Sequence, residues 1–322
     1  LVEDDAGEHA AMATSRSTER CMLKAPVFGS GKVPDASARI PDAASIEAAK
    51  EHAVAANTDG PSVYYCLVLL ISSRFRVLYI CIPAYNEAPT VGLLLWRLRS
   101  VMQEFAREYE ILVYNDGSTD GTAETLQSYE EVLPLSVLGG DEHRGYGYAL
   151  SALARAVSMR TRYPRRDGML TMQADFTDRP ENVPELVKRF EGGADLVVAE
   201  REVSDAWPGP ARMLRRVAPL VTRPFIDLPD VKDPFGTLRV YRISIIRDML
   251  KAAGDDAVVR FDGGSANVEL LVRAARPARG IESVSFTPRY ELRPRSTRVR
   301  PWKGLLALYR SARALRAGTV TP

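Results

Sequence analysis

The segment RVLYICIPAYNE (Arg76–Glu87) decides the fold that we expect for this chain of 322 residues. Its apolar run, Val77–Pro83, has the length and composition of a buried strand, and a polar cluster follows at once. Two later segments repeat this pattern, EILVYNDGSTDGT (Glu110–Thr122) and GMLTMQADFTDRPE (Gly168–Glu181). Because open α/β sheets bind ligands beyond the carboxyl ends of their strands, the three polar clusters predict a shared ligand site.

Working outward from these segments, strands alternate with amphipathic helices along most of the chain. This alternation predicts an α/β fold in which helices flank a mostly parallel central sheet. The expected strands are Val77–Pro83, Ile111–Asn115, Leu133–Leu138, Met169–Ala174, Asp195–Ala199, Thr237–Tyr241 and Gly280–Phe286. The expected helices are Pro89–Arg107, Thr119–Tyr129, Gly145–Met159, Pro180–Phe190, Pro210–Phe225, Ile243–Lys251, Ser265–Ala275 and Trp302–Arg316. The last of them is a basic amphipathic helix.

Composition divides the chain into three expected regions. Residues 1–60 are rich in Ala, Ser, Asp and Glu, which predicts a flexible extension because they can bury little apolar surface. Residues 61–300 form the expected α/β domain, and residues 301–322 form the helical tail. The longest apolar run, Val63–Ile71, is too short to span a bilayer, which takes about 20 apolar residues. Three cysteines without metal-ligand spacing favour a reducing, cytoplasmic compartment.

Charge is distributed unevenly between the two halves. Residues 1–200 contain 20 Lys and Arg against 29 Asp and Glu, whereas residues 201–322 contain 23 against 12. The acidic half suits metal binding, and the basic half suits phosphates or an anionic membrane face. Nucleic acid is a weaker interpretation, because basic residues are not interleaved with aromatic residues in any run.

The motifs as a group resemble family 2 glycosyltransferases of the GT-A fold. Within that family they are most similar to the branch of dolichol-phosphate mannose synthase and the polyprenyl-phosphate sugar synthases. The resemblance rests on IPAYNE (Ile82–Glu87), NDGSTDGT (Asn115–Thr122), HRGYGYAL (His143–Leu150), QADFTDRPE (Gln173–Glu181) and AER (Ala199–Arg201). It implies inverting, metal-dependent transfer of a hexose to a polyprenyl or dolichyl phosphate. The donor would be a nucleotide-diphosphate sugar of the GDP-mannose or UDP-glucose type.

The first two motifs predict the nucleoside pocket. The backbone amides after the first strand, the ring of Tyr85 and the carboxylate of Glu87 would hold base and ribose. Asp116, an acceptor-only side chain, would read N–H or O–H donors of the nucleoside. The expected nucleoside residues are Pro83, Ala84, Tyr85, Glu87 and Asp116.

The third motif adds a cation to this expected pocket. Family members commonly have Gly-Lys-Gly at this point, whereas this chain keeps Arg144 beside the first glycine and has Tyr146 at the lysine position. Arg144 is therefore expected to contact the donor. His143 is either a base or a solvated loop histidine.

The fourth motif predicts the metal site. Family members usually have Asp-x-Asp here, and its carboxylates hold Mg²⁺ or Mn²⁺ against the donor phosphates. This chain has Gln173-Ala174-Asp175, so Asp175 becomes the chief expected ligand, with Gln173 and Asp178 completing the site. A neutral Gln173 should weaken metal binding, because hard cations prefer charged oxygens. In the alternative interpretation, Asp175 and Asp178 only cap the helix that follows.

The basic half predicts phosphate binding. A phosphate monoester is already mostly a dianion at neutral pH, so it needs cations more than a general base. The expected phosphate-binding arginines are Arg201, Arg212, Arg216, Arg293 and Arg295. Asp233 and Arg239 in KDPFGTLRVYR, and Glu269 in ANVELLVRAAR, resemble later family segments. We expect Asp175, Arg201 and Glu269 to be catalytic.

Three other functions stay open from the sequence. The acceptor could be a hydroxyl, which would require a general base such as Glu269, Asp233 or His143. The chain could bind nucleotide sugars without turnover. A nucleotidyltransferase is weaker, because a glycine-rich loop is missing after the first strand. The tail helix either lies on the cytoplasmic membrane face as a peripheral anchor or packs on the domain's own flank.

Overall fold

The computed structural model describes residues 76–105, 107–201, 231–254, 256–286 and 301–316, together with positions 209, 212–213, 216–217, 220 and 224. Side chains of the last segment are described from position 305. The expected extension at 1–60, the apolar run at 63–71, two of the three cysteines, and Arg293 and Arg295 lie outside the described residues.

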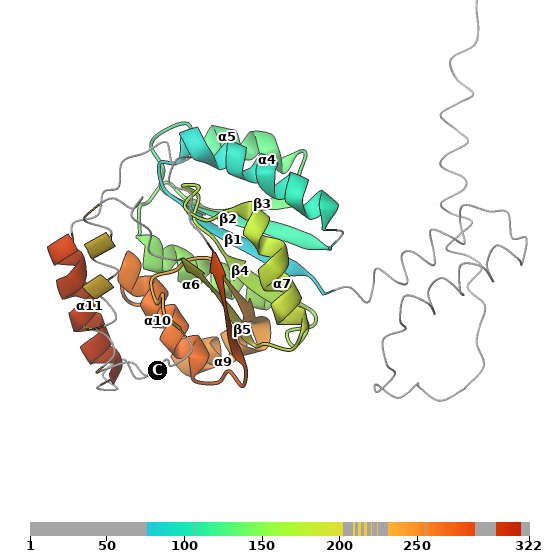
Figure 1. Cartoon of the computed structure of the whole chain (residues 1–322). Helices are drawn as coiled ribbons and strands as arrows, with labels where there is room; N and C mark the ends of the chain where they lie inside the picture. The colour runs from blue at the N-terminus through green and yellow to red at the C-terminus, as the bar shows by residue number, and fades with distance from the viewer. Residues whose placement is uncertain are drawn as a thin grey trace, which may run out of the picture. The chain divides into compact units, whose positions relative to one another are not determined.

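Strands and helices alternate as the sequence predicts (Figure 1). The strands are β1 (Leu78–Ala84), β2 (Tyr109–Asp116), β3 (Leu135–Gly140), β4 (Gly168–Thr171), β5 (Leu196–Arg201), β6 (Arg239–Arg242) and β7 (Ile281–Phe286). The helices are α4 (Ala88–Glu104), α5 (Thr122–Glu130), α6 (Tyr146–Arg160), the 3₁₀ turn η1 (Pro180–Asn182), α7 (Val183–Glu191), α9 (Ile243–Ala253), α10 (Gly264–Ala275) and α11 (Pro301–Arg316).

The described strands form one sheet in the order β3-β2-β1-β4-β6-β5-β7. β1 pairs in parallel with β2 and β4, and β2 pairs in parallel with β3. β6 is antiparallel to both β4 and β5, so β5 runs in the same direction as β4, and β7 is parallel to β5. The expected mostly parallel sheet is therefore confirmed, with β6 as the antiparallel exception.

The alternation of side chains along β1 explains why both faces of the sheet are covered. Leu78, Ile80 and Ile82 point into a core with α4, α5 and α7, whereas Tyr79 and Cys81 point into a second core with α6, α9 and α10. Each of these residues is at most 5% exposed. A strand that is apolar at every position is expected when helices pack on both faces. The result is a three-layer α/β/α arrangement (Figure 1).

Helix α11 packs outside α10 through one side of its surface. Leu308, Ala312 and Leu315 are buried against Val268 and Val272 of α10. Of the two locations predicted for this helix, the flank of the domain is the one that these contacts support. Leu306 and Tyr309 stay 50% and 40% exposed on α11, and Arg310 and Arg313 are exposed as well.

Most element boundaries differ from the prediction by one to three residues, and at two of them an aspartate causes the difference. β4 ends at Thr171 rather than Ala174, because the N–H of Gln173 turns away from the sheet and donates to Asp178. Helix α5 begins at Thr122 rather than Thr119, because the carboxylate of Asp120 accepts the N–H of Thr122 and holds the preceding loop open. None of the described helices is both long and apolar enough to span a membrane.

Candidate functional site

The polar clusters that follow the first strands meet at one edge of the sheet. The register pairs Ala84 at the end of β1 with Asn115 on β2, and Asn115 in turn with Gly139 on β3. β4 and β5 run in the same direction as these strands, so Arg201 at the end of β5 lies at the same edge. This is the edge at which parallel α/β sheets bind ligands.

The loop after β1 and the loop after β2 are hydrogen-bonded to each other. Asn86, which has a positive φ of 55°, accepts the N–H of Thr119 at 2.8 Å. The N–H of Ala88 donates to Asp120 at 3.2 Å, and the N–H of Thr122 donates to the other oxygen of Asp120 at 3.0 Å. Burial alone would raise the pKa of Asp120, but these hydrogen bonds outweigh it and lower the pKa below its usual value. Asp120 therefore joins two loops and does not face a ligand.

The residues after β1 that we predicted to bind the nucleoside differ in whether their backbone or their side chain is exposed. Pro83 and Ala84 are buried, and Ala84 packs into the core, so only their backbone faces the edge. The ring of Tyr85 is 40% exposed. One oxygen of Glu87 accepts the hydroxyl of Thr90 at 2.9 Å, which orients this carboxylate at the start of α4. Tyr85 and Glu87 thus present side chains at this edge, and their predicted contact with a nucleoside stays a prediction.

Asp116, at the end of β2, is 3% exposed and receives its hydrogen bonds from the loop between β3 and α6. The N–H groups of Arg144 and Gly145 donate to its two oxygens at 2.8 and 2.9 Å. Nδ1 of His143 lies 2.9 Å from one of the same oxygens, and the His143 ring stacks on Tyr85 with centroids 4.0 Å apart. Asp116 therefore organises this loop, and His143 is held by two contacts although its side chain is 52% exposed.

The side chain of Arg144 folds back on its own loop. It donates to Glu142 at 2.7 Å and to the hydroxyl of Tyr148 at 2.7 Å, and it is 47% exposed. Hydrogen bonds to Glu142 and Tyr148 raise the pKa of this guanidinium further. The predicted contact of Arg144 with a donor stays a prediction.

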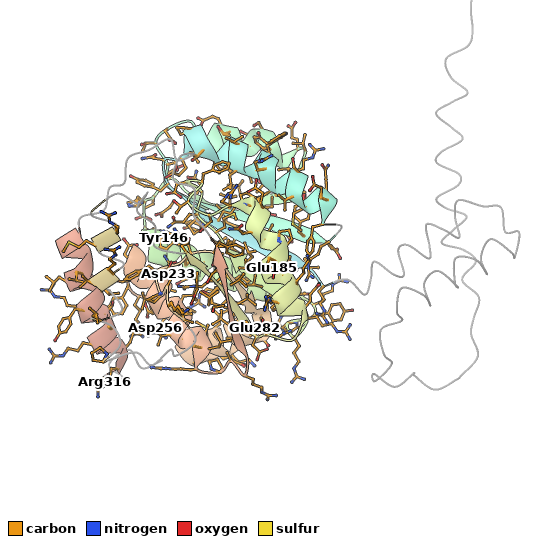
Figure 2. The ribbon with its side chains drawn as sticks, in the orientation of Figure 1. Tyr146, Glu185, Asp233, Asp256, Glu282 and Arg316 are labelled. Carbon is orange, nitrogen blue, oxygen red and sulfur yellow. The ribbon has the colours of Figure 1, made fainter. Side chains whose placement is uncertain are left out.

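Tyr146, the residue at the family's lysine position, points into the protein. Its hydroxyl donates to Asn267 at 3.0 Å (Tyr146 is labelled in Figure 2). Burial, and then the charge of Asp178, raise the pKa of this phenol above its usual value. The neighbouring Gly147 is required by packing, because a Cβ there would lie 2.0 Å from the carbonyl oxygen of Phe261.

The loop that follows β4 is organised by Asp178. This carboxylate is buried, accepts the N–H of Gln173 at 3.1 Å and the hydroxyl of Thr237, and pairs with Arg201 at 3.2 Å. The guanidinium of Arg201 also donates to Thr237 at 3.0 Å. The alternative in which Asp178 only caps the following helix is wrong, because the start of that helix has no side-chain cap. The structure brings the predicted metal loop and the predicted phosphate arginine together.

Three oxygens of this loop are candidate ligands for a divalent cation. One oxygen of Asp175 accepts the N–H of Thr177 at 2.9 Å, so the carboxylate is oriented by its own loop. The hydroxyl oxygen of Thr177 is buried and lacks a hydrogen-bond partner within the described part of the chain. Phe176 between them has a positive φ of 60°, a strained conformation for a bulky residue. Asp175, Thr177 and the amide oxygen of Gln173 thus suit a hard cation that also needs phosphate oxygens.

A complete metal site made by carboxylates, histidines or cysteines alone is not present in the described residues. They contain no group of three or more such side chains that could hold an ion. The carboxylate of Asp178 is engaged by Arg201 and by the N–H of Gln173. We therefore expect Asp178 to orient the loop that carries the cation ligands rather than to bind the ion itself.

Asp233 and Arg239 are both buried near the start of β6. Asp233 accepts the N–H of Phe235 at 3.1 Å. Arg239 is 1% exposed and donates to the carbonyl oxygens of Pro234 and Asn267 at 2.7 and 2.6 Å. These contacts fix the segment that precedes β6, and the predicted contact of either residue with a nucleotide sugar stays a prediction.

Glu269 on α10 is fully buried and both of its oxygens are used. One accepts the N–H groups of Arg260 and Phe261 at 2.7 and 2.9 Å, and the other accepts Nε of Arg273 at 3.0 Å. The carboxylate therefore ties the loop before α10 to the helix. The catalytic role predicted for Glu269 stays untested, but this geometry is that of a structural clasp.

The remaining predicted arginines lie in segments with little description. Arg212 is half-buried and Arg216 is exposed, and both have helical backbone.

Thr177 and Thr237 are the site residues that sequence reasoning missed. Both are hydroxyl residues inside segments quoted above, and their position next to predicted site residues was the signal that could have found them.

A comparison with models of known protein families identifies the family of this chain. The family model described as "Glycosyl transferase family 2" matches residues 79–250, which is more than half of the chain. The chain belongs to glycosyl transferase family 2. The predicted resemblance is confirmed, and the matched residues include the edge of the sheet described above.

Two curated relatives belong to the predicted branch. An undecaprenyl-phosphate 4-deoxy-4-formamido-L-arabinose transferase from Pseudomonas aeruginosa is 33% identical over 175 residues, which cover 53% of this chain and 48% of the relative. A dolichol-phosphate mannosyltransferase from Pyrococcus furiosus is 28% identical over 174 residues, covering 52% and 46%. The chain therefore spans about half the length of the curated relatives it matches.

Solved structures confirm the GT-A fold. Glucosyl-3-phosphoglycerate synthase from Mycobacterium tuberculosis in complex with uridine-diphosphate has a TM-score of 0.52 and 19% identity, covering 77% of this chain and 82% of that one. The same synthase with Mn²⁺, uridine-diphosphate-glucose and phosphoglyceric acid has a TM-score of 0.51 and 19% identity, covering 76% and 79%.

Proposed function

We propose that this glycosyltransferase transfers a hexose from a nucleotide-diphosphate sugar to a polyprenyl or dolichyl phosphate, with inversion and with the help of Mg²⁺ or Mn²⁺. The relatives described above, which are named for undecaprenyl phosphate and dolichol phosphate, support the acceptor. The donor sugar and its base are part of the proposal, and GDP-mannose and UDP-glucose are the first candidates.

The observation that carries the phosphate acceptor is the engagement of the two carboxylates that we predicted as general bases, Glu269 and Asp233. Both oxygens of Glu269 are held by loop amides and Arg273. Asp233 is buried with a backbone N–H on one oxygen. A hydroxyl acceptor needs a base within reach of its proton, whereas a phosphate dianion does not. The arrangement therefore favours a phosphate.

The transfer itself needs positioning and charge compensation. A phosphate oxygen of the acceptor attacks the anomeric carbon, and the bond from that carbon to the donor's diphosphate oxygen breaks with its electron pair. When bound, the cation neutralises the charge that develops on the departing diphosphate. Asp175, Gln173 and Thr177 would hold it. Arg201 adds a positive charge beside this loop, oriented by Asp178 and Thr237.

The nucleoside would bind at the ends of β1 and β2. The Tyr85 ring and the Glu87 carboxylate face this edge, and base stacking on an aromatic ring is worth about 1–3 kcal/mol. Holding donor and acceptor for in-line attack supplies much of the rate in such a reaction. The pocket therefore contributes through orientation rather than through covalent chemistry.

A lipid-linked acceptor requires the protein to reach a membrane surface. The outward side of α11 presents Leu306 and Tyr309 beside Arg310 and Arg313, which suits an anionic bilayer face. In flotation assays with vesicles containing anionic lipid, the charge-reversed variant Arg310→Glu/Arg313→Glu should float several-fold less than the unmodified chain. Equal flotation of both would contradict a surface role for this helix.

Sugar transfer to lipid tests the proposed function directly. The chain is incubated with labelled GDP-mannose or UDP-glucose, polyprenyl phosphate and Mg²⁺ or Mn²⁺, and the lipid fraction is counted. Polyprenol, which lacks the phosphate, is the matched acceptor control, and Asp175→Asn is the matched protein control. Transfer that requires the phosphate and falls at least tenfold in Asp175→Asn is expected. Absence of transfer with every donor and both metals would refute the proposal, as would equal transfer to polyprenol.

A further inference from the structure

The loop between β3 and α6 is built to hold one side chain, His143, over the ends of β1 and β2. Asp116 accepts the N–H groups of the two residues after His143. Gly117 has a positive φ of 67°, and a Cβ there would lie 2.6 Å from the N atom of His143. The backbone of this loop therefore touches the end of β2, and glycine is the residue that permits this close approach.

The imidazole lies between two different strand ends. Nδ1 is 2.9 Å from a carboxylate oxygen of Asp116, which ends β2, and the ring stacks at 4.0 Å and 21° on Tyr85, which follows β1. The His143 side chain is 52% exposed, so the remainder of the ring faces outward at the ligand edge. His143 thus joins the two elements predicted to form the nucleoside pocket.

The contact with Asp116 decides which nitrogen carries the proton. Nδ1 also lies 3.2 Å from the backbone carbonyl oxygen of Asp116, and a carbonyl oxygen can only accept, so Nδ1 is the donor. In a neutral imidazole the other nitrogen, Nε2, is then an acceptor. The described polar contacts of this ring are made by Nδ1, so the lone pair of Nε2 in the neutral ring is left for an O–H or N–H group of a ligand. A carbonyl oxygen of a ligand would be repelled there.

We propose that His143 is a nucleoside-binding residue: Nε2 accepts a hydrogen bond from a ribose hydroxyl or a base N–H, while the ring holds Tyr85 in a stacking position. This inference rests on the proposed function, because it assumes that a nucleoside diphosphate binds at this edge. The proposal gives one side chain two functions, which are hydrogen bonding to the ligand and positioning of the Tyr85 ring. Substitutions can separate these functions.

Two variants of His143 separate these two functions. His143→Phe keeps a ring that can stack on Tyr85 but removes both nitrogens. His143→Asn keeps a short side chain that can donate to Asp116 but removes the stack and Nε2. Asp141→Asn is the matched control, because Asp141 lies in the same loop and is exposed.

The measurement is the dissociation constant of UDP, GDP and their 2′-deoxy and 3′-deoxy forms by titration calorimetry, together with KM and kcat for transfer. We expect His143→Phe, which loses the hydrogen bond but keeps a ring, to weaken nucleoside diphosphate binding by about 2- to 10-fold. His143→Asn loses the ring contact as well and should weaken binding by about 5- to 20-fold. KM for the donor should rise by the same factor, with kcat within about threefold of the unmodified value. Asp141→Asn should bind normally.

Binding of the deoxy ligands identifies which ligand group donates the hydrogen bond to Nε2. If Nε2 accepts a ribose hydroxyl, the unmodified chain loses affinity for that deoxy form, and His143→Phe loses nothing further. The other result is that each deoxy form loses the same affinity in the unmodified chain and in His143→Phe, while His143→Phe still binds UDP or GDP more weakly. The group that donates to Nε2 is then a base N–H, which also supports the proposal.

The outcomes separate this inference from the proposed function. Nucleoside diphosphate binding that is unchanged in both His143 variants would overturn the role of His143 and leave the proposed function intact. A fall in kcat and thermal stability with unchanged affinity would also overturn it, because His143 would then be structural. If the unmodified chain bound no nucleoside diphosphate, the proposed function would fall together with this inference.

Discussion

Replacing Glu269 with glutamine distinguishes a structural clasp from a catalytic group. The carboxylate is fully buried and accepts two loop N–H groups, from Arg260 and Phe261, and Nε of Arg273. Glutamine has nearly the same shape, but its NH₂ group must face either the loop amides or the guanidinium, and both are donors. The variant Glu269→Gln therefore creates a donor–donor conflict and leaves the charge of Arg273 without its counter-ion.

The size of the effect follows from burial. Removing one partner of a buried ion pair costs about 3–5 kcal/mol. Arg273 is 10% exposed and can relax toward water, so we expect the lower end, about 3 kcal/mol. For a domain of this size, that free energy lowers the melting temperature by about 6–12 °C. The sugar transferred per folded molecule should fall less than about tenfold, because the clasp does not touch the reacting atoms.

Unfolding by urea and by heat, followed by circular dichroism, measures the change. The double variant Glu269→Gln/Arg273→Met should recover about 2 kcal/mol, because it removes the unpaired cation. Glu282→Gln is the control, since Glu282 makes an exposed ion pair with Arg189 at 3.5 Å (Glu282 is labelled in Figure 2) and should cost less than about 1 kcal/mol. A Glu269→Gln protein that melts within 2 °C of the unmodified chain but loses transfer a hundredfold would refute this reasoning and make Glu269 catalytic.

Three further outcomes are expected. Gln173→Asp should lower the half-saturating metal concentration in the transfer assay several-fold, and unchanged metal dependence would show that this loop is not the cation site. Gly147→Ala should lower the urea midpoint strongly, because its Cβ would lie 2.0 Å from the Phe261 carbonyl oxygen, whereas Gly140→Ala has open space around it and should match the unmodified chain. Because the pKa of Asp120 is lowered in the folded state, its stabilisation is complete at neutral pH and is lost as pH falls through about 4 and below. The unmodified chain should therefore lose more stability than Asp120→Asn between pH 6 and pH 3, and parallel pH curves would contradict the role assigned to that carboxylate.

The strand ends could be read from the sequence because their physics is local. An apolar run followed by Pro, Gly, Asn and Asp predicts a buried strand and then a turn, and each such strand is present. The parallel arrangement follows from the helices between strands. These rules place Tyr85, Asp116 and Asp175 at one edge without any knowledge of contacts.

The partners of the buried charges could not be read in the same way. Asp178 is three residues from Asp175, which suggested a shared metal site, but its carboxylate is engaged by Arg201 and Thr237. These residues are distant in sequence and meet only because β4, β6 and β5 are neighbours in the sheet. The i, i+4 pair of Glu269 and Arg273 was visible in the sequence, whereas the loop amides that complete it were not.

The interlocked loops after β1 and β2 constrain how donor preference can change. Asn86 receives the N–H of Thr119, and Asp120 receives the N–H of Ala88, so neither loop has its own geometry without the other. If the nucleoside binds where we propose, donor preference should change with both loops together rather than residue by residue. A chimera that imports only one loop from a relative exchanges a shared set of hydrogen bonds for mismatched ones. Grafting both loops together is the route by which a different nucleotide could be installed on this scaffold.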